Sequence, residues 1–207
     1  MLRESPGEPA EIIVVSGLPR SGTSLMMRLL QAGGVDLVTD GVRAPDVDNP
    51  GGYFELERVR SLARDSAWLG AAQGKAIKVI SALLRHLPAD HRYRVLLLRR
   101  DLDEVLASQA QMLERRGVPR DPAEDVTLRA DFAAHLAATQ RWLHGSEAFE
   151  VHEVSYAGLI DSPAAELERV ASFLRRDLDL SAMRACVDPA LYRARAAGRS
   201  VSPDPSC

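Results

Sequence analysis

The fold is decided by a stretch near the start of the chain, Ile12-Ile13-Val14-Val15-Ser16-Gly17-Leu18-Pro19-Arg20-Ser21-Gly22-Thr23-Ser24. Its first four residues, all branched and apolar, predict a buried strand over 11–16. An amphipathic helix is expected over 21–32. Two glycines with four residues between them, placed between a strand and a helix, have the spacing of a phosphate-binding loop. The backbone N–H groups of such a loop and the N-terminus of its helix favour an anion such as phosphate or sulfate.

The side chains of this loop add donors but depart from the pattern of nucleoside triphosphatases. Thr23 stands where that pattern has a lysine, whereas Arg20 lies inside the loop, where its fork of donors can reach oxyanions. The hydroxyls of Thr23 and Ser24 are further donors. The alternative is a plain turn between a strand and a helix that happens to hold two glycines. The clustering of four polar side chains in one loop argues against that alternative.

Short apolar runs alternate with amphipathic stretches along the rest of the chain. This order predicts an α/β fold, a three-layer sandwich with a central parallel sheet, helices on both faces and a P-loop-type phosphate-binding loop. Further strands are expected over 76–80, 94–98 and 149–154, and a loop rich in Pro, Gly and Asp over 39–53. Further helices are expected over 56–72, 101–116 and 121–143, and from 162 onward. Capping boxes at Asp101 and Asp121 are expected to begin two of them.

Length and composition restrict the functional classes. The 207 residues, 46% of them hydrophobic, predict one domain over 11–196 between flexible ends, 1–10 and 197–207. A formal net charge of −3 gives no reason to expect a nucleic-acid partner. Two cysteines are too few for a disulfide framework or a metal site. No apolar run approaches a membrane span in length, and the N-terminus lacks an apolar signal-peptide core, so we expect a cytoplasmic protein.

The loop 19–24 resembles the 5'-phosphosulfate loop of the sulfotransferase family. The stretch 49–55, discussed below, is similar to an element of bacterial members of that family. The family's donor is 3'-phosphoadenosine 5'-phosphosulfate (PAPS). The resemblance implies that the 5' end of this donor is bound by Arg20, Ser21, Gly22, Thr23 and Ser24.

A second family element is an arginine at a strand end, followed eight positions later by a serine on the next helix. In the family these two side chains hold the 3'-phosphate of the donor. Arg100 and Ser108 of this chain have the same spacing, so the resemblance implies the same role for them. Tyr156 follows the strand 149–154 and is similar to a tyrosine of the family's Tyr-Glu-Asp-Leu element, although Ala157 and Gly158 replace the acids. Tyr156 therefore either approaches the adenine or packs in the core.

Sulfuryl transfer requires a base for the proton of the acceptor and cations for the charge on the leaving oxygens. The stretch 49–55 is similar to an Asn-Pro-x-Gly-Tyr-x-Glu element of bacterial sulfotransferases and places Glu55 where several members have the general base. The alternative for Glu55 is a solvated glutamate at a helix start. Lys78, one of two lysines among 26 basic residues, matches the lysine that donates to the leaving group, or is a snorkelling strand-end lysine.

The resemblance implies an enzyme that moves a sulfuryl group from PAPS to a hydroxyl or amine, in line and without a metal, with Lys78 and Arg20 as charge stabilisers. The acceptor is expected to be a small molecule or a carbohydrate, and the sequence does not predict the oligomeric state. Two alternatives stay open. A P-loop kinase or NTPase would need a loop lysine and an acidic strand end for magnesium, where this chain has Thr23 and the pair Arg99-Arg100. A nucleotide-binding module without catalysis would not need Glu55 and Lys78 to face the loop.

Overall fold

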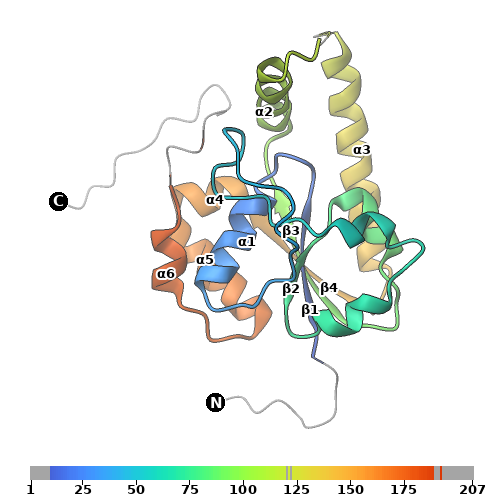
Figure 1. The fold of residues 1–207 in the computed structure, drawn as a ribbon, viewed down its shortest axis with the longest axis vertical. Coiled ribbons are helices and arrows are strands. Elements are labelled where there is room, and N and C mark those ends of the chain that lie inside the picture. Colours follow the sequence, from blue (N-terminus) through green and yellow to red (C-terminus); the bar gives the residue numbers. More distant parts are fainter. Residues whose placement is uncertain (1–9, 120, 122, 189–191, 193–207) are drawn as a thin grey trace, which may run out of the picture.

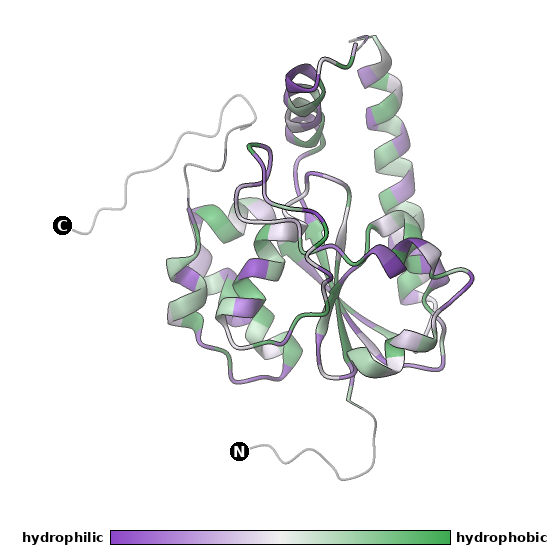
Figure 2. Ribbon diagram, in the orientation of Figure 1, coloured by the Kyte–Doolittle hydropathy of each residue, from purple (hydrophilic) through white to green (hydrophobic). Residues whose placement is uncertain are grey.

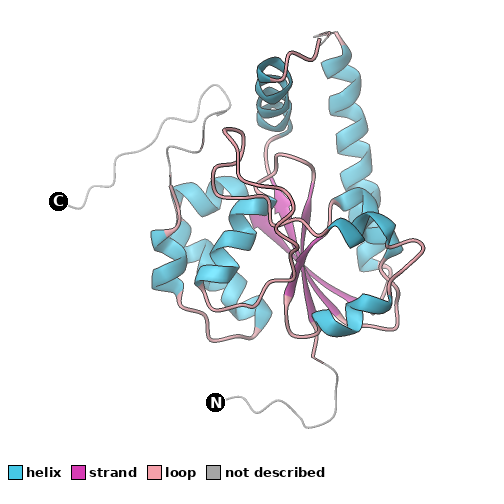
Figure 3. Cartoon of the chain, in the orientation of Figure 1, coloured by secondary structure: helices cyan, strands magenta, loops and turns pink. Residues whose placement is uncertain are grey.

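The sheet has four parallel strands in the order β2-β1-β3-β4 in the computed structural model of the chain. Figures 1 and 3 show this sheet between the helices. The structure describes residues 10–119, 121, 123–188 and 192, so the predicted flexible ends, apart from Ala10, lie outside the described residues. The strands are β1 (Ile12–Gly17), β2 (Ala76–Lys78), β3 (Tyr93–Arg99) and β4 (Phe149–Ser155). Because β1 has β2 on one side and β3 on the other, the strand order reverses between β1 and β3, and ligands bind at such a point.

Both faces of the sheet are buried, as the unbroken apolar runs predict. Along β1, Ile12 and Val14 face one hydrophobic cluster, whereas Ile13 and Val15 face the other. The central strands are hydrophobic over most of their length in Figure 2. A strand covered on both sides cannot alternate polar and apolar residues, and this explains why β1 and β3 read as continuous apolar runs.

Helices cover the two faces and complete the three layers (Figure 1). One face carries α1 (Thr23–Ala32), α5 (Pro163–Leu174) and α6 (Leu180–Ala185), with α4 (Tyr156–Asp161) beside them. The other face carries three 3₁₀ helices, η1 (Glu57–Ser61), η2 (Ala67–Ala72) and η3 (Ser81–His86), and the end of α3 (Glu124–His144) through Leu143. Together with α2 (Leu102–Arg115), α3 rises beyond the carboxyl ends of the strands. The predicted fold class is confirmed.

The structure corrects several predicted elements. The expected helix over 56–72 is two separate 3₁₀ helices, η1 and η2, because buried Val59, Leu62, Trp68 and Leu69 pack against the sheet from a winding segment. The strand expected over 76–80 ends at Lys78. The short helices α4, α6 and η3 have only one or two turns each, too few for a periodic pattern to show.

The two predicted capping boxes differ in outcome. Asp101 caps α2, since its side chain accepts hydrogen bonds from the backbone N–H groups of Asp103 and Glu104. Asp121 instead accepts from the backbone N–H of Ala123, and α3 begins at Glu124. Pro122, between Asp121 and Ala123 in the sequence, lies outside the described residues. Over the part of the chain that the structure describes, no helix is both long and apolar enough to cross a membrane.

Candidate active site

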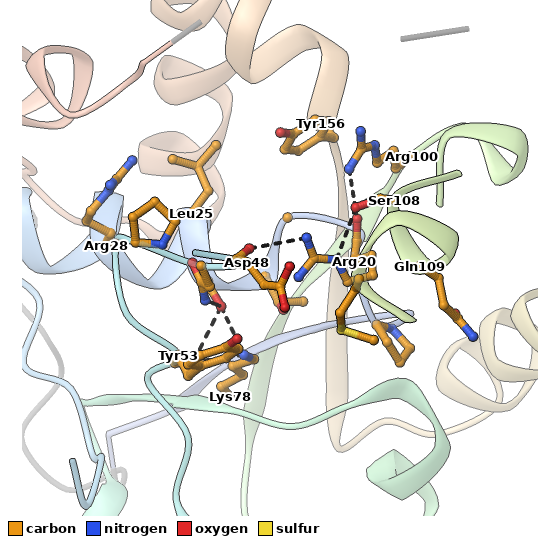
Figure 4. Close-up of a pocket in the computed structure, with 18 of the residues that line it drawn as sticks. Arg20, Leu25, Arg28, Asp48, Tyr53, Lys78, Arg100, Ser108, Gln109 and Tyr156 are labelled. Carbon is orange, nitrogen blue, oxygen red and sulfur yellow. Dashed lines mark hydrogen bonds between the residues drawn. The ribbon is translucent and has the colours of Figure 1, made fainter. Parts of the chain in front are cut away.

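A cleft of about 480 Å³ opens at the carboxyl ends of β1, β2 and β3 (Figure 4). The register places these ends together, because Val15 pairs with Lys78 and Gly17 pairs with Leu98. The loop after β1, the last residue of β2 and the first residues after β3 therefore meet. Of the ten residues predicted for the site, nine line this cleft: Arg20, Gly22, Thr23, Ser24, Glu55, Lys78, Arg100, Ser108 and Tyr156.

Ser21 is the predicted site residue that does not line the cleft. Its side chain is buried beneath the loop, and its Oγ has no hydrogen-bond partner among the described residues. A methyl group added at Gly17 would lie 2.4 Å from that Oγ, so the first glycine of the loop makes room for the serine. An unpaired buried hydroxyl is unusual in a folded protein.

The second glycine of the loop is required by its neighbour Tyr156. Gly22 has φ +101, in the left-handed region, and a methyl group there would lie 2.3 Å from Tyr156 Cδ2. Tyr156 begins α4, directly after β4, and its ring is buried against this glycine. The helix of the loop starts one residue later, at Thr23, so its N-terminus faces the cleft. The loop thus has the strand-loop-helix geometry that favours an anion.

Lys78 reaches the loop from the neighbouring strand. Its Nζ donates to Ser24 Oγ at 3.1 Å and to the carbonyl oxygen of Tyr53 at 2.8 Å (Figure 4). Burial lowers the pKa of Lys78 from 10.5 to about 8, while the charge of Glu55 opposes that shift. The ammonium is therefore charged at neutral pH but poorly hydrated, which strengthens its interaction with any anion in the cleft.

Glu55 lies beside Lys78 rather than on a helix. Its Oε1 is 3.8 Å from Lys78 Nζ and 3.1 Å from Arg43 Nη1, and its side chain is 33% exposed. The predicted helix start does not exist here, since η1 begins at Glu57. The carboxylate is held near the ammonium by charge while keeping contact with the cleft and with water.

Arg100 follows β3 and is almost enclosed. Its Nε donates to Glu104 at 3.1 Å and its Nη1 donates to the carbonyl oxygen of Arg20 at 3.0 Å. The guanidinium carbon lies 4.4 Å from the centre of the Tyr156 ring and 5.3 Å from that of Tyr192. The Tyr192 hydroxyl donates to Glu104, which completes a buried group around the arginine.

Arg20 lines the cleft, and its side chain turns toward α2 and the segment 39–53. Its φ is +70, and the side chain turns so that Nε donates to Ser108 Oγ at 3.0 Å and Nη2 donates to the carbonyl oxygen of Asp48 at 3.2 Å. Burial lowers the pKa of this guanidinium, and the Asp48 carboxylate partly opposes the shift. Arg20 thus joins the glycine loop, α2 and the segment 39–53.

Sequence reasoning missed the residues that hold the segment 39–53 over the cleft. The Asp48 carboxylate, only 4% exposed, pairs with Arg115 and Arg116 at the end of α2. Asn49 donates to Ser24 Oγ at 2.9 Å and to the carbonyl oxygen of Gly52 at 2.6 Å. No spacing in the sequence connects these residues, although the loop 39–53 was recognised as rich in Asp. Tyr192 was missed as well.

The family model described as "Sulfotransferase domain" matches residues 10–192 of this chain. The chain belongs to the sulfotransferase domain family. Its match includes the glycine loop, Glu55, Lys78, Arg100 and Ser108. A search of curated proteins gives no match.

Solved structures of sulfotransferases share the fold. The sulfotransferase domain from the Synechococcus PCC 7002 olefin synthase has a TM-score of 0.53 and 15% identity, and the alignment covers 98% of this chain and 94% of that one. The sulfotransferase domain from the curacin biosynthetic pathway has a TM-score of 0.51 and 13% identity, over 95% of each chain. Sulfotransferase STF9 from Mycobacterium avium has a TM-score of 0.51 and 14% identity, over 86% of this chain and 68% of that one.

Metal-ligand groupings are absent from the described part of this sulfotransferase domain. Within it, no three or more His, Cys, Asp or Glu side chains gather closely enough to hold an ion. The expectation of a metal-free reaction stays a prediction from the family resemblance.

Proposed function

We propose that this sulfotransferase-family chain transfers a sulfuryl group from PAPS to a hydroxyl or amine acceptor. The observation that carries the proposal is that Arg20 of the glycine loop, Lys78 of β2 and Arg100 after β3 line one cleft, with Glu55 Oε1 at 3.8 Å from Lys78 Nζ. A catalytically inactive binding module would not need a carboxylate beside a buried ammonium. The single domain over 11–196 and the cytoplasmic location stay predictions from the sequence.

The charges of the cleft suit a donor with several anionic groups. Seven arginine and lysine side chains line it, against the carboxylates of Asp48, Glu55 and Asp188 among the described residues. PAPS carries roughly four negative charges, two of them on its 3'-phosphate. We assign the 5'-phosphosulfate to the loop 20–24 and the 3'-phosphate to Arg100 and Ser108. Tyr156 is assigned to the adenosine side of the cleft, next to Arg100.

Each catalytic side chain has one role in the proposed transfer. Glu55 takes the proton of the acceptor as its oxygen or nitrogen forms a bond to sulfur. The bond between sulfur and the bridging oxygen breaks, and its electron pair stays on that oxygen of the leaving phosphate. Lys78 and Arg20 stabilise the charge that develops there and on the sulfuryl oxygens. The second product is adenosine 3',5'-bisphosphate.

The proposal is tested by incubating the full chain with PAPS labelled in its sulfuryl group and a panel of alcohols, phenols, amines and sugars. We expect labelled product from at least one acceptor class, with an equal amount of adenosine 3',5'-bisphosphate. A parallel incubation with ATP and magnesium tests the kinase alternative. Phosphoryl transfer from ATP, together with no transfer from PAPS, would overturn the proposal.

A further inference from the structure

The hydroxyl of Ser24 is the meeting point of the glycine loop, β2 and the segment 39–53. Its oxygen accepts a hydrogen bond from Asn49 Nδ2 at 2.9 Å and another from Lys78 Nζ at 3.1 Å. The same hydroxyl donates to the carbonyl oxygen of Tyr53 at 3.4 Å, near the limit of a hydrogen bond. Ser24, Asn49 and Lys78 all line the cleft.

The orientation of the Asn49 amide follows from its second contact. The atom that approaches Ser24 also lies 2.6 Å from the carbonyl oxygen of Gly52, which can only accept. That atom must therefore be the amide nitrogen, with one hydrogen for each of its two partners. Asn49 is thus a donor toward Ser24, and the turn 49–52, closed by the bond from Gly52 N to the Asn49 carbonyl oxygen, fixes its position.

Two donors on one hydroxyl oxygen determine the direction of its proton. A serine hydroxyl has two acceptor positions and a single hydrogen. Asn49 and Lys78 occupy both acceptor positions of Ser24, so its hydrogen must point at a third group. In the structure that group is the carbonyl oxygen of Tyr53, which accepts at 3.4 Å, a long and therefore weak hydrogen bond. An oxyanion in the mouth of the loop would be a better acceptor.

We propose that Asn49 is a positioning residue that turns the Ser24 hydroxyl into a fixed donor toward the anion in the loop. In this proposal Asn49 does not contact the anion; it donates to Ser24, and the Ser24 hydroxyl donates to the anion. This inference rests on the proposed function, since the anion is the phosphate end of the sulfuryl donor. It extends that function by giving a role to Asn49, which is neither part of the phosphate loop nor the proposed base.

A double-mutant cycle tests the inference on binding of adenosine 3',5'-bisphosphate, measured by titration calorimetry on the full chain. Loss of a hydrogen bond to a charged group predicts that Ser24→Ala weakens binding about tenfold or more. Asn49→Ala alone should weaken it about three- to tenfold, because the hydroxyl is free to turn. The double variant should match Ser24→Ala within about twofold, since Asn49 acts only through the serine.

Two further variants keep the result interpretable. Asn49→Asp keeps the shape of the side chain but accepts instead of donating, so it should weaken binding more in the native background than with Ser24→Ala. Its charge repels the bisphosphate equally in both backgrounds, so the difference isolates the part that passes through Ser24. Gln109→Ala removes another cleft amide and should change affinity less than about twofold in either background.

The outcomes separate the two claims. If the native chain does not bind the bisphosphate at all, the proposed function fails. If it binds, the affinity losses decide the inference. Should the losses from the Asn49 and Ser24 substitutions multiply in the double variant, and should Asn49→Asp cost the same in both backgrounds, Asn49 does not act through Ser24 and the inference is overturned. Unfolding curves without nucleotide, recorded for every variant, identify losses that come from the fold.

Discussion

The guanidinium of Arg20 donates to the hydroxyl of Ser108 at 3.0 Å, although 88 residues separate them in the sequence. Arg20 belongs to the loop proposed for the 5' end of the donor, and Ser108 to the pair proposed for its 3'-phosphate. Arg100 adds a second link, because it donates to the carbonyl oxygen of Arg20 at 3.0 Å. The two halves of the proposed donor site are therefore in direct contact, at the point where β1 and β3 diverge.

The first prediction concerns Arg100. Substitution by alanine should weaken the binding of adenosine 3',5'-bisphosphate by about 1.5–3 kcal/mol, the range for a hydrogen bond to a charged group. The buried Glu104 loses its ion pair with Arg100 in this variant, so the melting temperature should fall as well. Arg100→Lys keeps a positive charge beside Glu104 and separates the two effects. The control is Arg99→Ala, whose side chain faces Glu153 instead. A larger loss of affinity from Arg99→Ala than from Arg100→Ala would show that Arg99, and not Arg100, corresponds to the arginine of the family element.

A second prediction uses two glycines with similar positive φ angles. Gly22 has φ +101 and Gly34 has φ +90, but a methyl group at Gly34 meets no atom within 4 Å, whereas one at Gly22 meets the Tyr156 ring. Gly34→Ala should cost about 1 kcal/mol of unfolding free energy, from backbone strain alone. Gly22→Ala should cost about 1–3 kcal/mol more and weaken nucleotide binding, because the ring must move. Equal unfolding curves for the two variants would show that Tyr156 does not constrain the loop.

The pKa of Lys78, lowered by burial to about 8, gives a third prediction. As pH rises through about 8, the free protein loses this ammonium, and bisphosphate affinity should fall between about pH 7 and about pH 9.5. Unfolding free energy should move the other way. Between about 8 and the usual value of 10.5 the unfolded chain binds more protons, so the contribution of this group to stability rises with pH. Lys78→Met should flatten both profiles, measured by calorimetry and chemical unfolding. If the native and Met profiles coincide, Lys78 does not titrate in this window.

The fourth prediction separates the base from the binding site. Glu55→Gln keeps the shape and removes the basicity, so turnover should fall about 10²–10⁴-fold while bisphosphate affinity stays nearly unchanged. The charge of Glu55 supports the ammonium of Lys78, so the comparison belongs near pH 7, below the lysine pKa of about 8. Label transfer from PAPS to an acceptor found in the panel is the readout. Full turnover in the Gln variant would remove Glu55 as the base.

Much of the fold could be predicted because β1 and β3 are buried on both faces and therefore carry unbroken apolar runs. The loop Gly17–Gly22 could be predicted from its glycine spacing between an expected strand and an expected helix. The segment 56–72 could not, because apolar residues that pack from a winding chain imitate helical spacing. The partners of Asp48 could not either, since its ion pairs with Arg115 and Arg116 span 67 and 68 residues and no local pattern connects them. A loop defined by its local pattern was easier to predict than the bonds between loops.

The most direct measurement is a calorimetric titration of the full chain with adenosine 3',5'-bisphosphate and with ADP, both in the presence of a metal chelator. The two ligands differ in the 3'-phosphate that Arg100 and Ser108 are proposed to hold. The bisphosphate should bind at least about tenfold more tightly than ADP, a difference of about 1.4 kcal/mol or more. Equal affinities would contradict the assignment of the 3'-phosphate site, and with it the use of PAPS as the donor.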